Sequence, residues 1–348
     1  MKNKKKIIVV ASIILILGIT LLMIELNTKL FSRLLKGIPL DWNKELGIII
    51  TDEKIKIPLP KGFKNTKITN KINEGIVIED IDGNQFVWVS TINVKFERSS
   101  YGRLYSLDSI NDSKEEKDKI LYFSDDDIPA MGSYWEDKND SQYIKIMKSQ
   151  KKYKGFYIGR YEASYASGSD IEDYKPGSKK TISNSLNSMK HEKGTLWNYI
   201  SQEDAMVIAS NMYKDNVTIV SHIPFAAEWD TTLLWLVETK AKTMDEISKD
   251  SSQWGNTGRD KFTKTFGLID TGSFEETKAN NIYDLSGNLL EWTQENYGDR
   301  DNAVARGGYW YGYLKTDSTP TPASCRINRY KKDLAVRSIG FRVALYIK

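Results

Sequence analysis

Hydrophobic residues are arranged along this chain in two ways, first as one unbroken run and later as short alternating segments. The run extends from Ile7 to Ile24 without a charged residue. At about 1.5 Å of helical rise per residue, it is just long enough to cross the hydrocarbon core of a bilayer. Four lysines precede it within residues 1–6, so the positive-inside rule places that end in the cytoplasm. The pattern predicts a single-pass anchor at residues 7–24 in the cell membrane, with the rest of the chain extracytoplasmic.

A cleaved signal peptide is the alternative interpretation of this run. Signal peptides end at a cleavage site with small residues. The segment after Ile24 reads ELNTKLFSRL, which has no such site, and no cysteine for lipid attachment lies near it. We therefore prefer an uncleaved anchor, followed by a partly helical tether over residues 25–55.

Beyond the tether, alternating apolar and polar positions predict short β-strands. Residues 75–80 and 85–90 are rich in β-branched and aromatic side chains, and the Asp-Gly-Asn between them suits a hairpin. Further strands are predicted within residues 153–167 and 338–348.

Helical spacing of apolar residues predicts two main helices, within residues 201–213 and 221–240. Ser201 has the position of an N-cap, with acidic residues in the turn that follows. Residues 109–120, 124–141 and 249–280 are polar and charged, and we interpret the first two as solvated insertions. The fold class is therefore α+β, loop-rich, with small antiparallel sheets and two main helices.

Charge and the rare residues exclude several functions. The 50 basic and 46 acidic residues are nearly balanced, so a nucleic-acid partner is not predicted. The chain has one cysteine, Cys325, and two histidines, His191 and His222. These exclude a disulfide within the chain and offer no zinc-like ligand spacing. A Ser-His-Asp hydrolase is also not predicted, because no G-x-S-x-G elbow is present.

The segment NIYDLSGNLLEW, residues 281–292, carries two carboxylates among apolar and aromatic residues. They belong to Asp284 and Glu291. One interpretation is that they bind a cation. The other is that Asp284 caps a turn and Glu291 pairs with an arginine such as Arg306 or Arg342.

Six segments resemble, in order, the motifs of the formylglycine-generating enzymes, or sulfatase-modifying factors. They are GFYIGRYEAS, SQEDAMVIA, IPFAAEWD, NIYDLSGNLLEW, ARGGYWY and IGFRVAL. The resemblance covers about residues 55–348, which gives the domain boundary at residue 56. It implies a C-type-lectin-like variant of the α+β class. It also implies a structural calcium site at residues 281–292, formed by the side chains of Asp284 and Glu291 and the carbonyls of Gly287 and Leu289. Calcium prefers such oxygen ligands.

Enzymatic members of the family oxidise a substrate cysteine with oxygen and with copper held by two neighbouring cysteines. In this chain the interval from Arg306 to Arg342 contains only Cys325. One thiol cannot form a two-thiolate copper site within the chain, so copper is not predicted. The family's iron-dependent relatives need several histidines, which His191 and His222 do not supply.

The sequence therefore predicts a non-catalytic domain that binds an extracytoplasmic protein or glycan. A formylglycine-generating oxidase with Cys325 as its catalytic residue is the alternative function. Aromatic faces and fixed donors near the C-terminus form the predicted ligand-binding set. Its members are Tyr309, Trp310, Tyr311, Tyr313, Arg326, Asn328 and Arg329.

Overall fold

The computed structural model describes ten parts of the chain. They are residues 43–92, 97–99, 102–104, 134–135, 141–164, 196–248, 250–257, 268–297, 302–310 and 322–348. Within these parts no helix is both long and apolar enough to cross a membrane. The predicted anchor at residues 7–24 lies outside them. Gly47–Lys348 forms one unit by its internal contacts.

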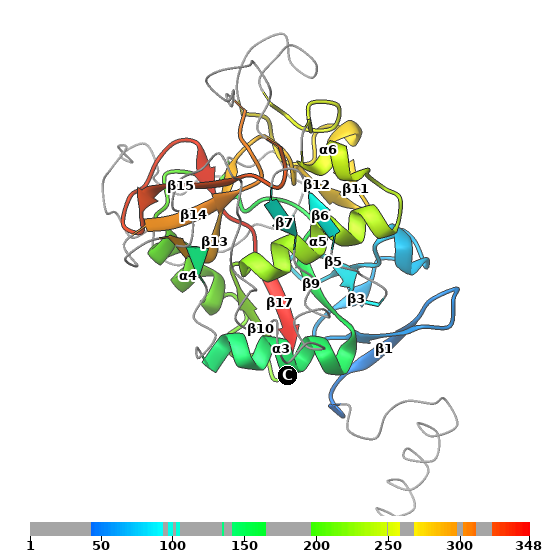
Figure 1. The fold of residues 1–348 in the computed structure, drawn as a ribbon. Coiled ribbons are helices and arrows are strands. Elements are labelled where there is room, and N and C mark those ends of the chain that lie inside the picture. Colours follow the sequence, from blue (N-terminus) through cyan, green and yellow to red (C-terminus); the bar gives the residue numbers. More distant parts are fainter. Residues whose placement is uncertain are drawn as a thin grey trace, which may run out of the picture. The chain divides into compact units, whose positions relative to one another are not determined.

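A six-stranded antiparallel sheet occupies the centre of this unit (Figure 1). Its strands are, in spatial order, β10 (Ile219–His222), β17 (Ala344–Ile347), β9 (Gly155–Gly159), β5 (Gln85–Ser90), β4 (Val77–Glu79) and β3 (Lys64–Asn65). The predicted hairpin is confirmed as β4 and β5, with Ile78 opposite Phe86. Its turn is held by Asp80, whose carboxylate accepts from the backbone N–H groups of Asp82 and Asn84. The C-terminal strand β17 lies beside β9 and β10 in the sheet.

A second sheet has five strands. Its strands are β15 (Arg326–Lys331), β14 (Asn302–Arg306), β13 (Leu290–Tyr297), β16 (Ile339–Gly340) and β8 (Tyr134–Trp135). β13 pairs with β16 in parallel and with β14 and β8 antiparallel. This sheet brings together residues from four separate parts of the sequence.

Three two-stranded ribbons complete the described strands. They are β1 (Gly47–Ile50) with β2 (Lys56–Leu59), β6 (Glu97–Ser99) with β7 (Gly102–Leu104), and β11 (Lys278–Ala279) with β12 (Ile282–Tyr283). β1 begins before residue 56, within the segment that the sequence assigned to the tether.

The described helices are α3 (Ser141–Tyr153), α4 (Gln202–Asn211), α5 (Ala226–Glu238) and the short α6 (Met244–Ser248), with 3₁₀ turns at Ile72–Glu74 and Glu275–Thr277. α4 begins as predicted, because the Ser201 side chain accepts from the backbone N–H of Asp204. At α5, Glu228 accepts from the N–H of Phe225 and satisfies a donor at the helix start. The prediction of two main helices is wrong, because α3 is a third helix that is as long as α5.

The main core lies between α5 and the six-stranded sheet. Almost every side chain of α5 is buried, as expected for a helix covered on all sides. Trp229, Leu233 and Leu236 of this helix belong to one apolar cluster with Val87 and Ile158 of the sheet. Figure 1 shows α5 crossing the strands at the centre of the molecule. The core therefore fixes α5 against the sheet, and with it the polar side chains that α5 directs toward β13–β15.

Candidate functional site

Two arginines face each other where β14 and β15 pair. Arg306 ends β14 and Arg326 begins β15, and they are cross-strand partners. Like charges in directly opposite positions destabilise an antiparallel pair. Two carboxylates offset this repulsion, one from Asp230 on α5 and one from Glu295 on β13.

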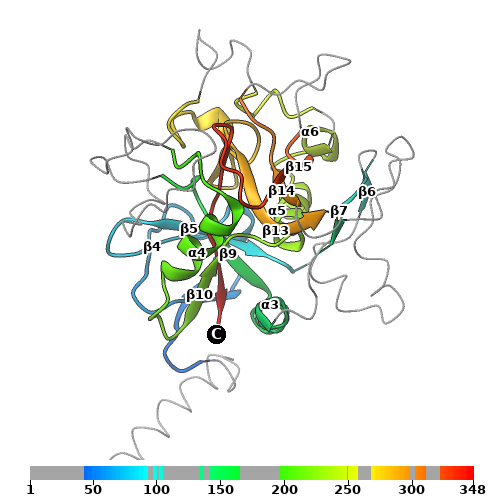
Figure 2. The same ribbon diagram turned by 90° about the vertical axis from the view of Figure 1, so that its left-hand side faces the viewer.

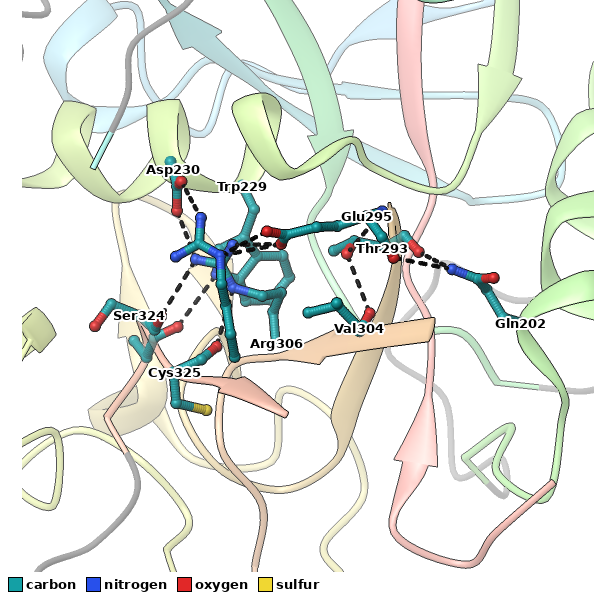
Figure 3. Close-up of polar contacts among 11 residues, drawn as sticks. Gln202, Trp229, Asp230, Thr293, Glu295, Val304, Arg306, Ser324 and Cys325 are labelled. Atoms are coloured by element: carbon teal, nitrogen blue, oxygen red, sulfur yellow. Dashed lines mark hydrogen bonds and ion pairs between the residues drawn. The ribbon is translucent and has the colours of Figure 1, made fainter. Parts of the chain in front are cut away.

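Each carboxylate bridges both arginines. Figure 3 shows Asp230 and Glu295 directed toward Arg306. Asp230 Oδ1 lies 2.5 Å from Arg306 Nη2, and its other oxygen accepts from Arg326 Nη2. Glu295 Oε2 lies 3.3 Å from Arg306 Nη1, and Arg326 Nε donates to Glu295 Oε1 at 2.8 Å. The four side chains form a closed network of equal positive and negative charge, which we call the arginine–carboxylate network.

This network is almost completely shielded from solvent. Arg306 is 0% exposed, and Asp230 and Glu295 are each 1% exposed. Burial alone lowers the pKa of Arg326, but Asp230 and Glu295 raise it overall, so its charge is retained. Buried charges persist only when they are paired and hydrogen-bonded, a condition that the network meets. Arg326, predicted to bind ligand, is thus committed to internal ion pairs.

Cys325 lies next to this network and contributes its backbone rather than its thiol. Arg306 Nε donates to the Cys325 carbonyl at 3.0 Å, and Arg306 Nη2 to the Ser324 carbonyl at 3.3 Å. Figure 3 shows the carbonyl of Cys325 facing the arginine and the sulfur directed away from it. Trp229 Nε1 also donates to the Ala323 carbonyl at 3.2 Å. The segment before β15 is therefore attached to α5 and β14 through its carbonyls.

The surroundings of half-buried Cys325 favour the protonated form of its thiol. Burial raises its pKa to about 11, and the nearby charges of Arg306 and Arg326 only partly oppose this effect. Thiolates, not thiols, attack electrophiles and bind soft metals. At neutral pH the only thiol of the chain is thus poorly suited to either role.

The second arginine of interest, Arg342, is bound by Glu291. Its Nε and Nη2 donate to the two carboxylate oxygens of Glu291 at 2.6 and 2.5 Å. The remaining donors reach the carbonyls of Gly159 and Tyr283, each at 3.0 Å. Arg342 thereby connects β9, β12 and β13. The contacts of Glu291 match the arginine-pairing alternative drawn from the sequence.

Asp284 lies close to this pair but has different partners. Its Oδ2 accepts from Thr271 Oγ1 at 3.0 Å and from the backbone N–H of Gly272 at 2.8 Å. Its Oδ1 is buried and has no hydrogen-bond partner. Asp284 therefore stabilises a turn, as the alternative interpretation has it, while one oxygen remains available to a cation.

The two backbone residues of the predicted calcium set lie in the same tight loop. Gly287 has φ +76° and its N–H donates to the Gly307 carbonyl, and Leu289 is buried. A calcium ion on this set would have to share Glu291 with Arg342 or displace it. Among the residues that the structure describes, no three His, Cys, Asp or Glu side chains form a group that could hold a metal ion.

Glu162 is a buried carboxylate beside this loop that sequence reasoning missed. Its Oε1 accepts from the backbone N–H of Leu289 at 2.9 Å, and its Oε2 from Asn288 Nδ2 at 2.5 Å. Burial raises its pKa well above the usual value, and the charges of Asp284 and Glu291 add to the effect. Its occurrence in the YEAS motif, an acid between aromatic and small residues of a strand-like segment, is the feature that could have indicated it.

The predicted ligand-binding set is only partly described. Tyr309 and Trp310 are half-buried in the turn after β14, and the guanidinium carbon of Arg337 lies 5.3 Å from a Trp310 ring centroid. Tyr311 and Tyr313 lie outside the described residues, as do the side chains of Asn328 and Arg329, whose backbone belongs to β15. Of the predicted set, Tyr309 and Trp310 therefore lie half-buried in one turn, whereas Arg326 forms internal ion pairs.

A match to a family model confirms the family resemblance. Residues 128–347 match the family described as the sulfatase-modifying factor enzyme 1-like domain. Two solved structures are similar at low identity. CarF is 18% identical, with 56% of this chain and 87% of that chain covered, at a TM-score of 0.37. The Treponema denticola variable protein 1 is 14% identical, with 55% and 84% covered, at a TM-score of 0.35. No curated protein matches the chain. Since the family match covers most of the chain, the protein belongs to the sulfatase-modifying factor family, as a member with a single cysteine.

Proposed function

We propose that this chain is a non-catalytic member of its family, anchored in the membrane by residues 7–24. Its extracytoplasmic domain, of the C-type-lectin-like type, binds a protein or glycan. The observation that carries the proposal is the state of Cys325. It is the only cysteine, its thiol is directed away from the arginine–carboxylate network, and its pKa is raised to about 11.

The oxidase is the second candidate function, and one observation favours it. Cys325 lies between Arg306 and Arg342, in the interval where catalytic members carry their cysteines. The two functions differ in what Cys325→Ser does. An oxidase that depends on this thiol loses all conversion of a cysteine peptide, whereas a binding domain keeps its affinity for its ligand.

Recognition is assigned to the turn after β14, around Tyr309, Trp310 and Arg337. Trp310 is held in place because its backbone N–H donates to the Asn288 carbonyl at 3.0 Å. Aromatic faces beside a guanidinium suit the apolar faces and hydroxyls of sugars, and equally the side chains of a peptide. Tyr309 and Trp310 are each half-buried, so part of each residue is open to solvent.

A binding screen tests this surface. The domain would be applied to a glycan array and to a displayed peptide library, with Trp310→Ala and Ile81→Ala in parallel. We expect Trp310→Ala to lose at least about tenfold in affinity for any captured ligand, as at interface hot spots. Ile81 is exposed on the β4–β5 turn, so its variant is the matched control and should bind as the wild type does. Equal binding by both variants would contradict the assignment.

Calcium is part of the proposal as a structural ion at residues 281–292. The buried Oδ1 of Asp284, which has no hydrogen-bond partner, supports calcium binding. The ion pair between Glu291 and Arg342 opposes it, because a calcium ion would compete with Arg342 for Glu291. If calcium binds the folded state, a concentration of a hundred times its dissociation constant adds about 2.7 kcal/mol of stability. Thermal unfolding with calcium or a chelator measures this. Asp284→Asn should abolish the calcium-dependent rise in Tm, and the exposed Asp52→Asn should keep it. A wild-type Tm that calcium does not change would remove calcium from the account.

A further inference from the structure

Helix α3 carries positive charge on its exposed side. Lys145, Lys148, Lys151 and Lys152 are all exposed, and the helix contains no acidic residue. Its buried side holds Tyr143, Ile146 and Tyr153, which pack toward the sheet. The charge is therefore concentrated on one outward face and is not neutralised within the helix.

Next to this face lies a groove between α3 and the C-terminal strand. Its volume is about 380 Å³, within the range of small-ligand sites. Lys145, Lys148, Lys152 and Lys348 form its rim, and the remaining lining residues are Ser149, Tyr153, Val220, Tyr346 and Ile347. A cationic rim over a largely apolar floor is complementary to an anionic amphiphile, with its charged group at the lysines and its first apolar atoms on the floor.

We propose that this basic groove binds the headgroups of anionic phospholipids in the membrane that holds the chain. Lysines close to an anionic bilayer are attracted to it, and their long stems keep the ammonium at the headgroup level. Exposed apolar side chains occur beside the lysines, with Ile144 on α3 at 40% exposure and Val217 before β10 at 51%. Charged and apolar side chains mixed in this way are typical of interfacial surfaces.

The mostly apolar lining between the lysines favours a lipid over an acidic protein segment, because a lipid headgroup brings apolar atoms next to its negative charge. Figures 1 and 2 both show α3 and the C-terminus at the same end of the Gly47–Lys348 unit. The inference rests on the membrane anchor of the proposed function and not on its recognition surface.

Vesicle experiments with the full chain test the proposal. The chain would be mixed with vesicles of phosphatidylcholine alone or with phosphatidylglycerol added, and lysine modification by an amine reagent would be followed by mass spectrometry. Because each lysine near an anionic surface gains roughly a factor of five in binding, we expect Lys145, Lys148 and Lys152 to react about fivefold more slowly with phosphatidylglycerol. High salt should restore their reactivity. Lys64 and Lys71, exposed on other elements, should react equally in both vesicles.

Variants make the result specific to the groove. In Lys145→Gln/Lys148→Gln/Lys152→Gln, the phosphatidylglycerol-dependent protection of Lys348 should disappear. The matched variant Lys64→Gln/Lys71→Gln should retain it. Equal labelling of the rim lysines in both vesicles would overturn the proposal, and so would protection by a polyglutamate peptide in place of the anionic vesicles.

Flotation in the same samples separates this proposal from the anchor. Flotation with both vesicle types supports the anchor, and the labelling then decides the groove. Flotation only with anionic vesicles refutes the anchor while it supports the groove. A chain that floats with neither contradicts both.

Discussion

At the scale of single residues, three buried carboxylates interact with a single buried arginine, Arg342. Glu162, Asp284 and Glu291 interact electrostatically, and Arg342 is the cation that stabilises them. Arg342 donates to Glu291 alone among these side chains. The excess of negative charge falls on Glu162, whose pKa is raised by burial and by its two acidic neighbours. A proton on Glu162 would relieve this excess.

The raised pKa of Glu162 predicts a specific pH dependence of stability. A carboxyl whose pKa is raised in the folded state stabilises most below its unfolded pKa, and this contribution is lost as pH rises through the folded pKa. Glu162→Gln keeps the shape but cannot ionise. In urea unfolding, the free energy of unfolding of Glu162→Gln, relative to that of the wild type, should therefore increase as the pH rises from acidic to neutral. Glu203→Gln, at an exposed position of α4, is the control and should follow the wild type. A difference independent of pH would show that Glu162 has the same pKa in the folded and unfolded states, which would contradict the raised pKa.

The arginine–carboxylate network predicts a large cost for removing one charge. Asp230→Asn leaves two buried guanidiniums with a single carboxylate, and such a change costs about 3–5 kcal/mol. Glu238→Gln, exposed on the same helix α5, should change stability by no more than about 0.5 kcal/mol. Chemical denaturation measures both. A cost for Asp230→Asn below about 1 kcal/mol would contradict the account of the network as a closed unit.

At the scale of elements, local sequence patterns predicted most of the helices and hairpins that form between residues close in the sequence. The β4–β5 hairpin, α4 with its Ser201 cap and α5 follow from side-chain periodicity and turn residues. Helix α3 was missed, although Tyr143, Ile146 and Tyr153 have helical spacing, because the lysines and the adjacent acidic insertions dominated its composition. Strand β10 was not predicted, since its pairing with β17 joins residues far apart in the sequence.

The candidate site was predictable only in its residue types. Sequence reasoning found Asp284, Glu291, Cys325 and the arginines, and it offered the Glu291–Arg342 pair as one of two alternatives. It assigned Arg326 to ligand binding, because nothing local indicates that Asp230 and Glu295 meet it from α5 and β13. Partners that converge from separate elements depend on tertiary packing, which no short motif records.

The loop at residues 281–292 provides a test of close backbone packing. Gly287 has φ +76°, and a Cβ there would lie 2.3 Å from the Asn256 carbonyl oxygen. Gly62 has φ +90° but open space around it. Gly62→Ala should therefore cost about 1–2 kcal/mol from backbone conformation alone. Gly287→Ala should cost at least about 2 kcal/mol more, because the carbonyl must move. Equal costs in thermal or urea unfolding would mean that the loop relaxes freely around residue 287.

At the scale of the whole molecule, the family suggests an enzyme, whereas the cysteine content does not. The chain belongs to a family named for an enzyme that modifies sulfatases, yet it has one thiol, held protonated beside a network already satisfied internally. The proposed anchor, basic groove and aromatic turn assign membrane attachment and recognition to separate surfaces. Under the proposed function, the domain does not perform the oxidation carried out by catalytic members of the family.

The most direct test is an oxidation assay on residues 43–348. The domain would be incubated with Cu(I), oxygen and a peptide carrying a sulfatase-type cysteine motif, and the mass of the peptide would be followed. A two-cysteine member of the family serves as the positive control, and Cys325→Ser as the matched variant. We predict that the peptide is unchanged by both the wild type and the variant while the control converts it. Conversion of the cysteine to an aldehyde by the wild type, and its loss in Cys325→Ser, would contradict the account and make Cys325 a catalytic residue.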